Sequence, residues 1–570
     1  MKNSRIYFLA LSIIIICFVL IGRLFFLQVL NHDFYQELAA NQHNIHKILF
    51  PKRGEIFIKD RFYKQDSSEL FSLAINRTWQ MVYAIPNEIQ DREEVVEKLS
   101  PLLKLGKEEL KKRINKRSDP YEPLEHKLSS SIVQKIKELN IKGIELEEET
   151  QRYYPANDLA SHVLGFVGFF EDKRMGQYGI EGYYNEKLEG VYGFLEGEKD
   201  TAGRLIAVAK QNSQPAEDGV DLVLTLDPNI QYFVEEKLKE IFETLDAESG
   251  TIIIENPKTG AIKALANWPQ FDPNKYYEVD GISTFLNPAI NGVFEPGSVF
   301  KPITMAIALN KKLITPNTVY EDKGFVKIRG SIIRNSHPEP EGIQTMTQVL
   351  EKSLNTGAVF VNQLISKKVF KEYLDKFGFS KKTGIDLGGE VKGNLSNLNT
   401  NGDVEFATAS FGQGIAVTPI ELVAAFSAIA NHGEMVRPHI VEKFIYNDGK
   451  EEKVEKEVIA RPISENTANE LTKMMISVIE NGFGKEAGVD GYFVAGKTGT
   501  AEVPNIEEGG YSDKTIHCFI GFFPAFDPEF TMLIKLDNPK GIRFAADSIA
   551  PVFGEIAEYI LNYYEIPPSR

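Results

Sequence analysis

A serine and a lysine three positions apart, Ser298 and Lys301, are the first candidates for covalent chemistry in this sequence. Pro296-Gly297 before them is typical of a loop, and the apolar run from Ile303 to Leu309 predicts a buried helix. At the start of a helix, a spacing of three places both side chains on one face. Because a serine hydroxyl is a poor nucleophile, a neutral amine beside it is one way to remove its proton.

The same pair has a plain structural interpretation, in which Ser298 caps the helix and Lys301 lies at the surface. Ser298 is, however, the only serine in the chain with a lysine at this spacing, and the helix that follows has a buried pattern. Pro302 has no backbone N–H, so the first turn cannot be a regular α-helical turn and we expect a tightened one. Motifs elsewhere in the chain have to decide between the two interpretations.

Two later motifs carry side chains that would complete such a site. Ser353-Leu354-Asn355 offers a hydroxyl beside an amide, and Lys497-Thr498-Gly499-Thr500 offers an ammonium and hydroxyls on a predicted strand. Both patterns recur, in Ser464-Glu465-Asn466, Lys258-Thr259-Gly260 and Lys382-Thr383-Gly384. Sequence context separates them, because Ser464 has the pattern of a helix N-cap and the other two lysine motifs lie in turns.

The chain around these motifs predicts an α+β domain over residues 220–570. It opens with a strand at 220–227 and a helix from Pro228 to about Thr244, and two strands at 251–255 and 261–266 form a hairpin. Three more strands and a helix close the chain, at Tyr492–Glu502, His517–Phe523, Phe530–Leu536 and Ala545–Tyr563. Strands at both ends of a helical middle predict one antiparallel sheet, flanked by helices and assembled from distant segments.

The N-terminus predicts a single membrane anchor at residues 6–30, behind a cytoplasmic tail of residues 1–5. Residues 6–22 are almost wholly apolar, the pattern resumes after Arg23, and Lys2 and Arg5 favour a cytoplasmic N-terminus. A cleaved signal peptide is the alternative, but there is no small-x-small cleavage site before Asn31. We therefore expect a single-pass protein of the cytoplasmic membrane whose catalytic domain lies on the outer side.

Residues 31–219 predict a mixed α/β domain without chemistry of its own. Gln80 to Ile85 has a strand pattern, and the dense Lys/Glu patterning from Asp91 to Asn140 predicts solvated amphipathic helices. The segment shows no metal-ligand spacing and no acid/base pair, so we interpret it as an elongated pedestal for spacing, docking or dimerisation. A polar stretch at 211–215 marks its boundary.

Composition argues against nucleic-acid binding and against a disulfide. The 570 residues carry a net charge of −16 at pH 7, which argues against nucleic acid as a partner. The two cysteines, Cys17 and Cys518, lie near opposite ends of the chain, so we expect no intramolecular disulfide. We expect neither a metal ion nor an organic cofactor.

The ordered trio of Ser298-x-x-Lys301, Ser353-x-Asn355 and Lys497-Thr498-Gly499 is the set found in penicillin-binding proteins and serine β-lactamases. With the anchor and the N-terminal domain, the chain resembles a class B penicillin-binding protein, a monofunctional peptidoglycan transpeptidase. Further matching segments are Arg53–Ile56, Arg152–Pro155, Gly179–Glu181, Leu224–Asp227, Ser410–Gly414 and Gly521–Pro524. The match breaks near Asp60-Arg61, since two extra residues precede this pair and Phe62-Tyr63 replaces the usual Asn-Gly turn.

The resemblance implies that Ser298 attacks the carbonyl between two D-alanines of a stem pentapeptide and expels the terminal D-alanine. An amine of a neighbouring stem then takes the acyl group, and β-lactams acylate the same serine. Lys301 can act as the base only if its pKa falls from about 10.4 towards neutrality, and burial and the charge of Lys497 both act in that direction. Ser353 would relay a proton from one of the lysines to the departing amine.

The resemblance also implies the substrate contacts. Asn355 would hold the substrate amide, and Thr498, Gly499 and Thr500 would line the site of the terminal carboxylate beside the lysine of that motif. The backbone N–H groups of Ser298 and Thr500 would form the oxyanion hole.

A glycan-polymerising domain is not recognisable in the sequence, so polymerisation would come from a SEDS-family membrane partner, contacted through the anchor and the N-terminal domain. The segments around Ser298 and Lys497 favour a role in division over one in elongation. A D,D-carboxypeptidase or serine β-lactamase would use the same trio but needs neither the anchor nor the N-terminal domain. A penicillin sensor is expected to carry more membrane helices, and a catalytically inactive scaffold is disfavoured because every motif side chain is present.

Overall fold

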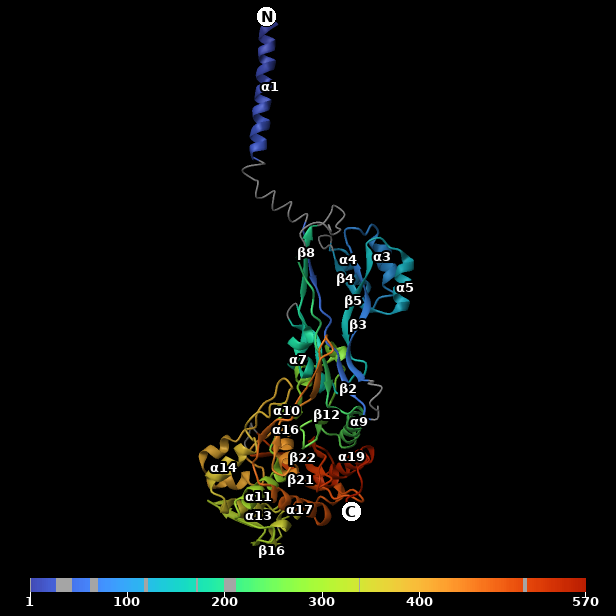
Figure 1. The fold of residues 1–570 in the computed structure, drawn as a ribbon. Coiled ribbons are helices and arrows are strands. Elements are labelled where there is room, and N and C mark those ends of the chain that lie inside the picture. The colour runs from blue at the N-terminus through green and yellow to red at the C-terminus, as the bar shows by residue number, and fades with distance from the viewer. Residues whose placement is uncertain are drawn as a thin grey trace. The chain divides into compact units, whose positions relative to one another are not determined.

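The computed structural model describes residues 2–26, 44–61, 70–116, 121–170, 173–198, 212–337, 339–505 and 510–570 (Figure 1). The chain forms two compact units, one of Met1–Gly54 with Glu189–Gly219 and one of Glu55–Leu188 with Val220–Arg570. Residues 55–188 thus group with the C-terminal half, whereas the sequence predicts a linear division after residue 219. The linear domain layout stays a prediction.

The first unit contains one long helix and a small sheet. Helix α1 spans Lys2–Phe25, and strands β1 (Asn44–Leu49), β8 (Gly193–Glu198) and β9 (Asn212–Gln214) form an antiparallel sheet in the order β1-β8-β9. Across the described ranges, none of the helices combines the length and the apolar content that a membrane span requires. The predicted anchor at residues 6–30 is therefore not confirmed, and residues 27–30 lie outside the described residues.

The second unit begins with a sheet that carries three short helices. Strand β3 (Leu70–Ala84) pairs antiparallel with β2 (Ile56–Lys59), β4 (Glu122–Leu128) and β5 (Ile144–Tyr153). The helices are α3 (Arg92–Leu99), α4 (Lys107–Ile114) and α5 (Ser130–Leu139). The helices predicted between residues 91 and 140 are present, but strand β4 lies between α4 and α5. The sequence did not predict this strand, because its alternation of buried and exposed residues is short and lies among charged residues.

The strand predicted at 220–227 does not join the central sheet, which corrects that prediction. It is β10 (Asp221–Leu224), and it pairs in parallel with β2 and antiparallel with β18 (Val441–Ile445) in the order β19-β18-β10-β2-β3-β4. Leu222, Val223 and Leu224 are all buried, as expected of a strand covered on both faces. Within the charged segment 447–457, strand β19 (Glu451–Lys453) pairs antiparallel with β18.

The N-terminal hairpin whose sequence is atypical is only partly described. Asp60 and Arg61 follow β2, whereas Phe62 and Tyr63 lie outside the described residues, as does Gln211 of the predicted boundary loop.

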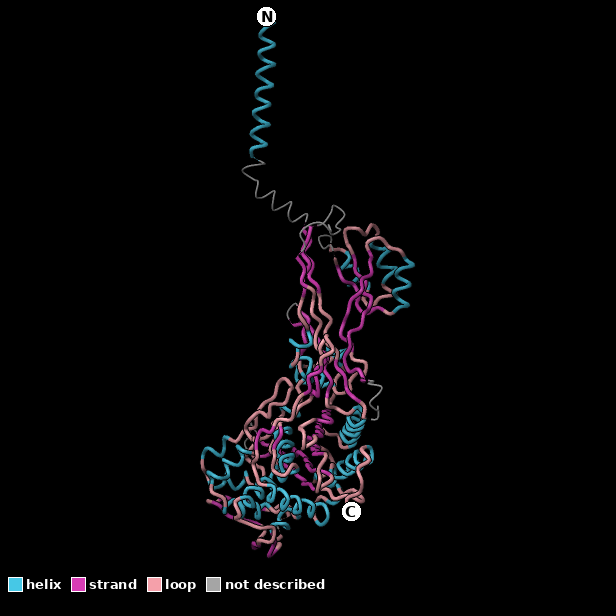
Figure 2. The backbone as a smooth tube through the Cα atoms, in the orientation of Figure 1, coloured by secondary structure: helices cyan, strands magenta, loops and turns pink. Residues whose placement is uncertain are grey.

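The predicted central antiparallel sheet is confirmed, and it joins segments from both ends of the C-terminal half. Its five strands run in the order β12-β11-β23-β22-β21. Their bounds are β11 Ser249–Glu255, β12 Ile262–Trp268, β21 Ala495–Pro504, β22 Tyr511–Phe523 and β23 Phe530–Asp537. The strands lie between helices, which makes the unit an α+β fold (Figure 2).

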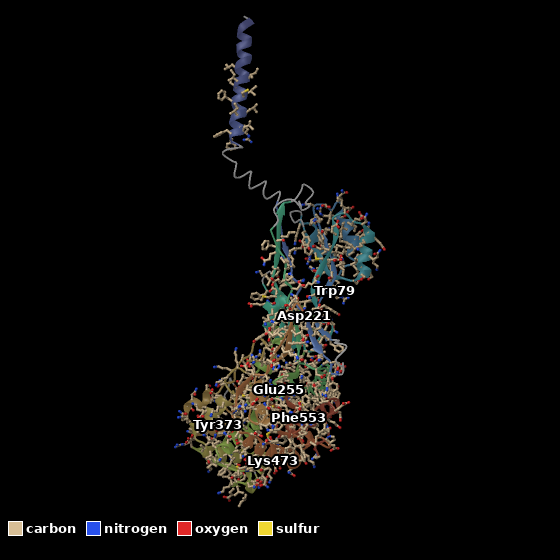
Figure 3. The ribbon with its side chains drawn as sticks, viewed as in Figure 1. Trp79, Asp221, Glu255, Tyr373, Lys473 and Phe553 are labelled. Atoms are coloured by element: carbon tan, nitrogen blue, oxygen red, sulfur yellow. The ribbon has the colours of Figure 1, made fainter. Side chains whose placement is uncertain are left out.

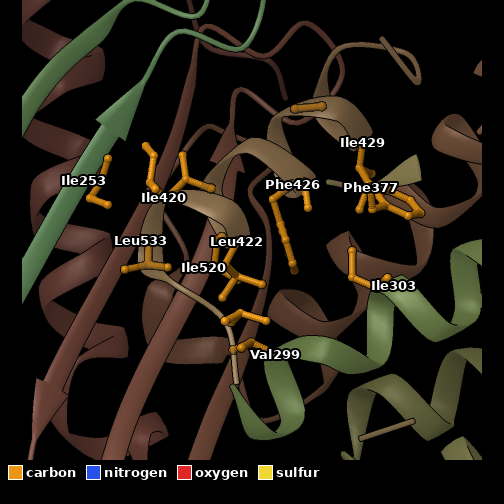
Figure 4. Close-up of a cluster of buried hydrophobic side chains, with 14 of the residues drawn as sticks. Ile253, Val299, Ile303, Phe377, Ile420, Leu422, Phe426, Ile429, Ile520 and Leu533 are labelled. Atoms are coloured by element: carbon orange, nitrogen blue, oxygen red, sulfur yellow. The ribbon is translucent and has the colours of Figure 1, made fainter. Parts of the chain in front are cut away.

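Alternation along β11 explains how both faces of this sheet are covered. Ile252 and Ile254 pack with helices α9 (Pro228–Thr244) and α19 (Ala550–Tyr563), both close to the predicted bounds. Ile253 points to the opposite face, where a second cluster includes Ile303 and Ile420 (Figure 4). Helix α11 (Lys301–Asn310), which follows Ser298, is therefore part of the core, as its apolar sequence predicts.

The remaining elements connect these layers. In the helical middle they are α10 (Pro288–Asn291), α12 (Met346–Glu351), α13 (Asn355–Leu364), α14 (Lys367–Lys376), α15 (Asp403–Ala409), α16 (Pro419–Ala430) and α17 (Glu465–Asn481). Elsewhere they are α6 (Ser161–Leu164), β6 (Phe166–Phe170), β7 (Lys173–Gln177), α7 (Gly179–Tyr183), α8 (Asn185–Glu189), β13 (Val319–Asp322), β14 (Phe325–Ile328), β15 (Ser331–Arg334), β16 (Gly342–Thr345), β17 (Met435–Val436), β20 (Val458–Ala460) and α18 (Ala545–Ser548). Ser464 caps α17 by accepting from the Thr467 backbone N–H, which confirms the N-cap prediction.

Candidate active site

Ser298 lies in a tightened turn at the start of α11. Residues Gly297–Phe300 form a 3₁₀ turn, and the backbone N–H of Lys301 donates to the Ser298 carbonyl. The turn predicted from Pro302 is thus confirmed, because a 3₁₀ turn needs no hydrogen bond from the residue after Lys301. The Lys301 side-chain nitrogen lies 3.0 Å from Oγ of Ser298, so the spacing of three does bring the pair together.

The structure brings Ser353 to the same place. Ser353 lies between α12 and α13, and Lys301 Nζ lies 2.5 Å from its carbonyl oxygen and 3.2 Å from its Oγ. Lys497 Nζ approaches the same hydroxyl at 3.0 Å. One hydroxyl therefore lies between two amines that come from distant parts of the chain.

Strand β21 carries Lys497 and packs closely on the turn that holds Ser298. The Lys497 nitrogen also lies 2.9 Å from the Thr498 carbonyl oxygen and 3.4 Å from Thr498 Oγ1. A Cβ on Gly499 would lie only 2.8 Å from Cγ1 of Val299. Because Gly499 has no side chain, β21 can approach the turn that holds Ser298.

Both lysines are fully buried, and this changes their acid–base behaviour. Lys301 and Lys497 are each 0% exposed. Burial, followed by the charge of Lys497, lowers the pKa of Lys301 well below its ordinary value. Burial lowers the pKa of Lys497 to about 7. A neutral Lys301 amine, which is the state that can accept the Ser298 proton, is therefore accessible near neutral pH.

The predicted substrate-binding residues also border this site. Asn355 is the first residue of α13, and its Nδ2 donates to the Arg334 carbonyl at 2.9 Å, so its Oδ1 is the atom suited to accept from a substrate amide. Thr500 Oγ1 accepts from the Ala545 backbone N–H at 3.0 Å, which directs its own hydroxyl hydrogen to another acceptor.

Sequence reasoning missed the residues that support the turn around Ser298. Gly297 donates its backbone N–H to the Gly412 carbonyl at 3.0 Å, and a Cβ on Gly412 would lie 2.2 Å from the Gly297 oxygen. Glu295 accepts from the Gly414 backbone N–H at 3.0 Å and from the Tyr511 hydroxyl at 3.1 Å. The motif Ser410–Gly414 was recognisable in the sequence, but its partner Tyr511 carries no spacing signal.

A second missed group is a buried polar network around Asp322, which accepts hydrogen bonds from Asn335 and from Thr356 in the first turn of α13. Within the described ranges, no three His, Cys, Asp or Glu side chains are grouped closely enough to hold a metal ion.

The chain is similar to known proteins over most of its length. The family model of the penicillin binding protein transpeptidase domain matches residues 250–558, and that of the penicillin-binding protein dimerisation domain matches residues 49–224. Stage V sporulation protein D of Bacillus subtilis is 32% identical over an alignment that covers 100% of this chain and 87% of the relative. A peptidoglycan D,D-transpeptidase FtsI homolog of Mesostigma viride is 30% identical, covering 97% and 94%. The crystal structure of penicillin binding protein 2X from Streptococcus thermophilus matches with a TM-score of 0.74 and 25% identity, covering 91% of this chain and 80% of the other.

Proposed function

The chain belongs to the penicillin-binding protein transpeptidases and acts on peptidoglycan as a D,D-transpeptidase, and we propose that Ser298 is the residue that carries the acyl group. The observation that carries this assignment is the position of Lys301 Nζ, 3.0 Å from the Ser298 hydroxyl and 3.2 Å from that of Ser353. An amine placed this way can take the proton of the attacking serine and pass a proton onward.

In the acylation step, Ser298 Oγ attacks the carbonyl between the two D-alanines of a stem pentapeptide while its proton moves to Lys301. The oxygen of the tetrahedral intermediate is bound by the backbone N–H groups of Ser298 and Thr500. As the peptide C–N bond breaks, the departing D-alanine amine takes a proton through Ser353, and the acyl group stays on Ser298 as an ester.

In the second step, an amine of a neighbouring stem attacks this ester. Its proton returns through the same groups to Ser298 Oγ, and the new amide is the crosslink. Asn355 holds the amide of the donor stem, and Thr498 and Thr500 bind its terminal carboxylate with charge from Lys497. A β-lactam enters the same step because its ring carbonyl takes the place of the D-alanyl-D-alanine carbonyl.

We propose that a D,D-carboxypeptidase or serine β-lactamase activity is the lesser alternative, since the same side chains serve transfer to water. The match of the dimerisation domain to residues 49–224 favours the transpeptidase, because a simple hydrolase does not need that segment. The same match and that of the transpeptidase domain to residues 250–558 support the division of the chain into a non-catalytic domain at 31–219 and a catalytic domain at 220–570.

For its location, we propose a single-pass anchor at residues 6–30, with residues 1–5 in the cytoplasm and the catalytic domain outside. The apolar sequence of residues 6–22 and the basic Lys2 and Arg5 support this orientation. A SEDS-family polymerase, contacted through the anchor and residues 31–219, would supply the glycan strand. We favour division over elongation as the process served.

Labelling of the full chain with a fluorescent penicillin tests the assignment. The wild-type protein should become covalently labelled, and Ser298→Ala should not, while its thermal unfolding stays unchanged. Nascent glycan supplied with a polymerase should be crosslinked by the wild type only. Persistent labelling of Ser298→Ala would reject the nucleophile, and release of D-alanine without crosslinks would favour the carboxypeptidase.

A further inference from the structure

A buried carboxylate, Asp322, bonds to the first turn of α13, the helix that follows Ser353. Asp322 ends strand β13 and is 1% exposed. Its Oδ1 accepts from Oγ1 of Thr356 at 2.5 Å and from Nδ2 of Asn335 at 3.0 Å, and its Oδ2 accepts from the backbone N–H of Glu341 at 3.0 Å. One carboxylate thus ties three separate segments together.

These bonds fix the first turn of α13. Thr356, its second residue, also donates its backbone N–H to Oδ1 of Asn335 at 3.1 Å, and its hydroxyl lies 3.1 Å from that of Tyr320. Asn355, the first residue, donates to the carbonyl of Arg334 at 2.9 Å. The start of α13 is therefore held by side chains and not only by the helix itself.

The backbone of Ser353 makes this support important. Ser353 has a φ of +54°, a left-handed conformation that costs a residue with a side chain on the order of 1 kcal/mol. On one side, the Leu354 backbone N–H donates to the Val349 carbonyl of α12 at 3.0 Å. On the other side, the Ser353 carbonyl lies 2.5 Å from Lys301 Nζ, and the chain runs on within two residues into α13. A shift of α13 would therefore move Ser353 Oγ.

The network requires an ionised carboxylate. Burial acts to raise the pKa of Asp322, but the hydrogen bonds that it accepts outweigh this effect and hold the pKa below its ordinary value. An ionised carboxylate accepts hydrogen bonds at both oxygens. In an asparagine at this position, the NH₂ group would replace one of these acceptors and would face an N–H or O–H donor of the network. The hydrogen-bond network at position 322 therefore requires the negative charge of an aspartate as well as its shape.

We propose that Asp322 is a positioning residue for acylation. Through Thr356 it fixes the start of α13, and thereby it holds the Ser353 hydroxyl between the two lysine side chains. The proposal rests on the proposed function, because it assigns Ser353 the proton relay. It predicts that the network sets the rate of the chemical step and has little effect on the initial binding of a β-lactam.

The sharpest test compares two substitutions at Thr356. Thr356→Val keeps the shape but removes the hydroxyl, and Thr356→Ser keeps the hydroxyl but removes a methyl group. The full chain is labelled with a fluorescent penicillin at several concentrations, which separates the acylation rate constant from the dissociation constant of the initial complex. Thr356→Val should lower the rate constant by at least about tenfold, since a hydrogen bond to a charged group is lost. Thr356→Ser should recover most of the rate, and the dissociation constant should change little in either variant.

Asp322→Asn provides an independent test, with Asp375→Asn on the exposed face of α14 as its matched control. Asp322→Asn should slow acylation as Thr356→Val does, and Asp375→Asn should not. Wild-type acylation rates in Asp322→Asn and Thr356→Val would overturn the proposal, as would equal losses in both Thr356 variants, which would indicate packing. A wild-type protein that is not labelled, or a Ser298→Ala variant that is, would reject the proposed function instead.

Discussion

Lys497 places its side-chain nitrogen 3.0 Å from the hydroxyl of Ser353, a residue 144 positions earlier in the chain. The amine of Lys497 is fully buried, and the hydroxyl is one of the few polar groups that it contacts. This contact joins β21, which we propose binds the substrate carboxylate, to the Ser353 loop, which we propose relays the proton.

The titration of the two lysines predicts a bell-shaped pH dependence of acylation. The rate should rise with pH as Lys301, whose pKa is lowered well below its ordinary value by burial and by the charge of Lys497, loses its proton. It should fall again above about pH 7, as Lys497 loses the charge that attracts the substrate carboxylate. The measurement is the second-order rate of labelling by a fluorescent penicillin between pH 5 and pH 10.

A substitution can separate the two limbs of this profile. Lys497→Arg keeps its charge to high pH, so the alkaline limb should move beyond the measured range. Lys473→Arg, on the exposed face of α17, is the matched control and should leave the profile unchanged. A wild-type rate that is flat over the whole range would contradict the assigned roles.

Gly499→Ala should slow acylation by about 100-fold, because displacement of the reacting groups by a fraction of an ångström to 1 Å has effects of this size. A Cβ at Gly499 would lie 2.8 Å from Cγ1 of Val299 and 3.1 Å from the Pro296 carbonyl oxygen, so β21 must move away from the Ser298 turn. Gly388→Ala is the control, since a Cβ there meets no atom within 4 Å. Equal labelling rates for the two variants would show that the close approach of β21 is unimportant.

Glu255→Met should stabilise the protein, and the gain should grow with pH. Glu255 ends β11 in the core (Figure 3) and is 0% exposed, and the hydroxyl of Ser427 is the hydrogen-bonding group beside its carboxylate. Burial raises its pKa to about 8, so the folded state keeps a proton that the unfolded chain releases above about pH 4.5. Wild-type stability therefore falls as the pH rises from 4.5 to 8, and the methionine variant should lack this loss.

The expected gain is about 2–4 kcal/mol at pH 8 and much less at pH 5, measured by denaturant unfolding at both values. Glu236→Met, at an exposed position of α9, is the control and should show no such difference. A gain that is the same at both pH values would mean that the ionisation of Glu255 is not its cause.

Local features of this protein followed from the sequence because they depend on neighbouring residues. The limits of α9, the hairpin between β11 and β12, the cap at Ser464 and the tightened turn before Pro302 are all set by contacts within a few positions. The order and spacing of the three motifs likewise predicted that Ser298, Ser353 and Lys497 belong to one site, and their side chains do lie together.

Only the tertiary structure decided how these parts combine. The 220–227 strand joins β2 and β18 instead of the central sheet, because pairing depends on segments far away in the chain that local alternation does not encode. The lowered pKa of Lys301 arises from burial and from a lysine nearly 200 positions away, which is a property of the assembled core. The contacts of Asp322 with Thr356 and of Glu295 with Tyr511 likewise have no fixed spacing, since side chains that meet only after folding carry no sequence period.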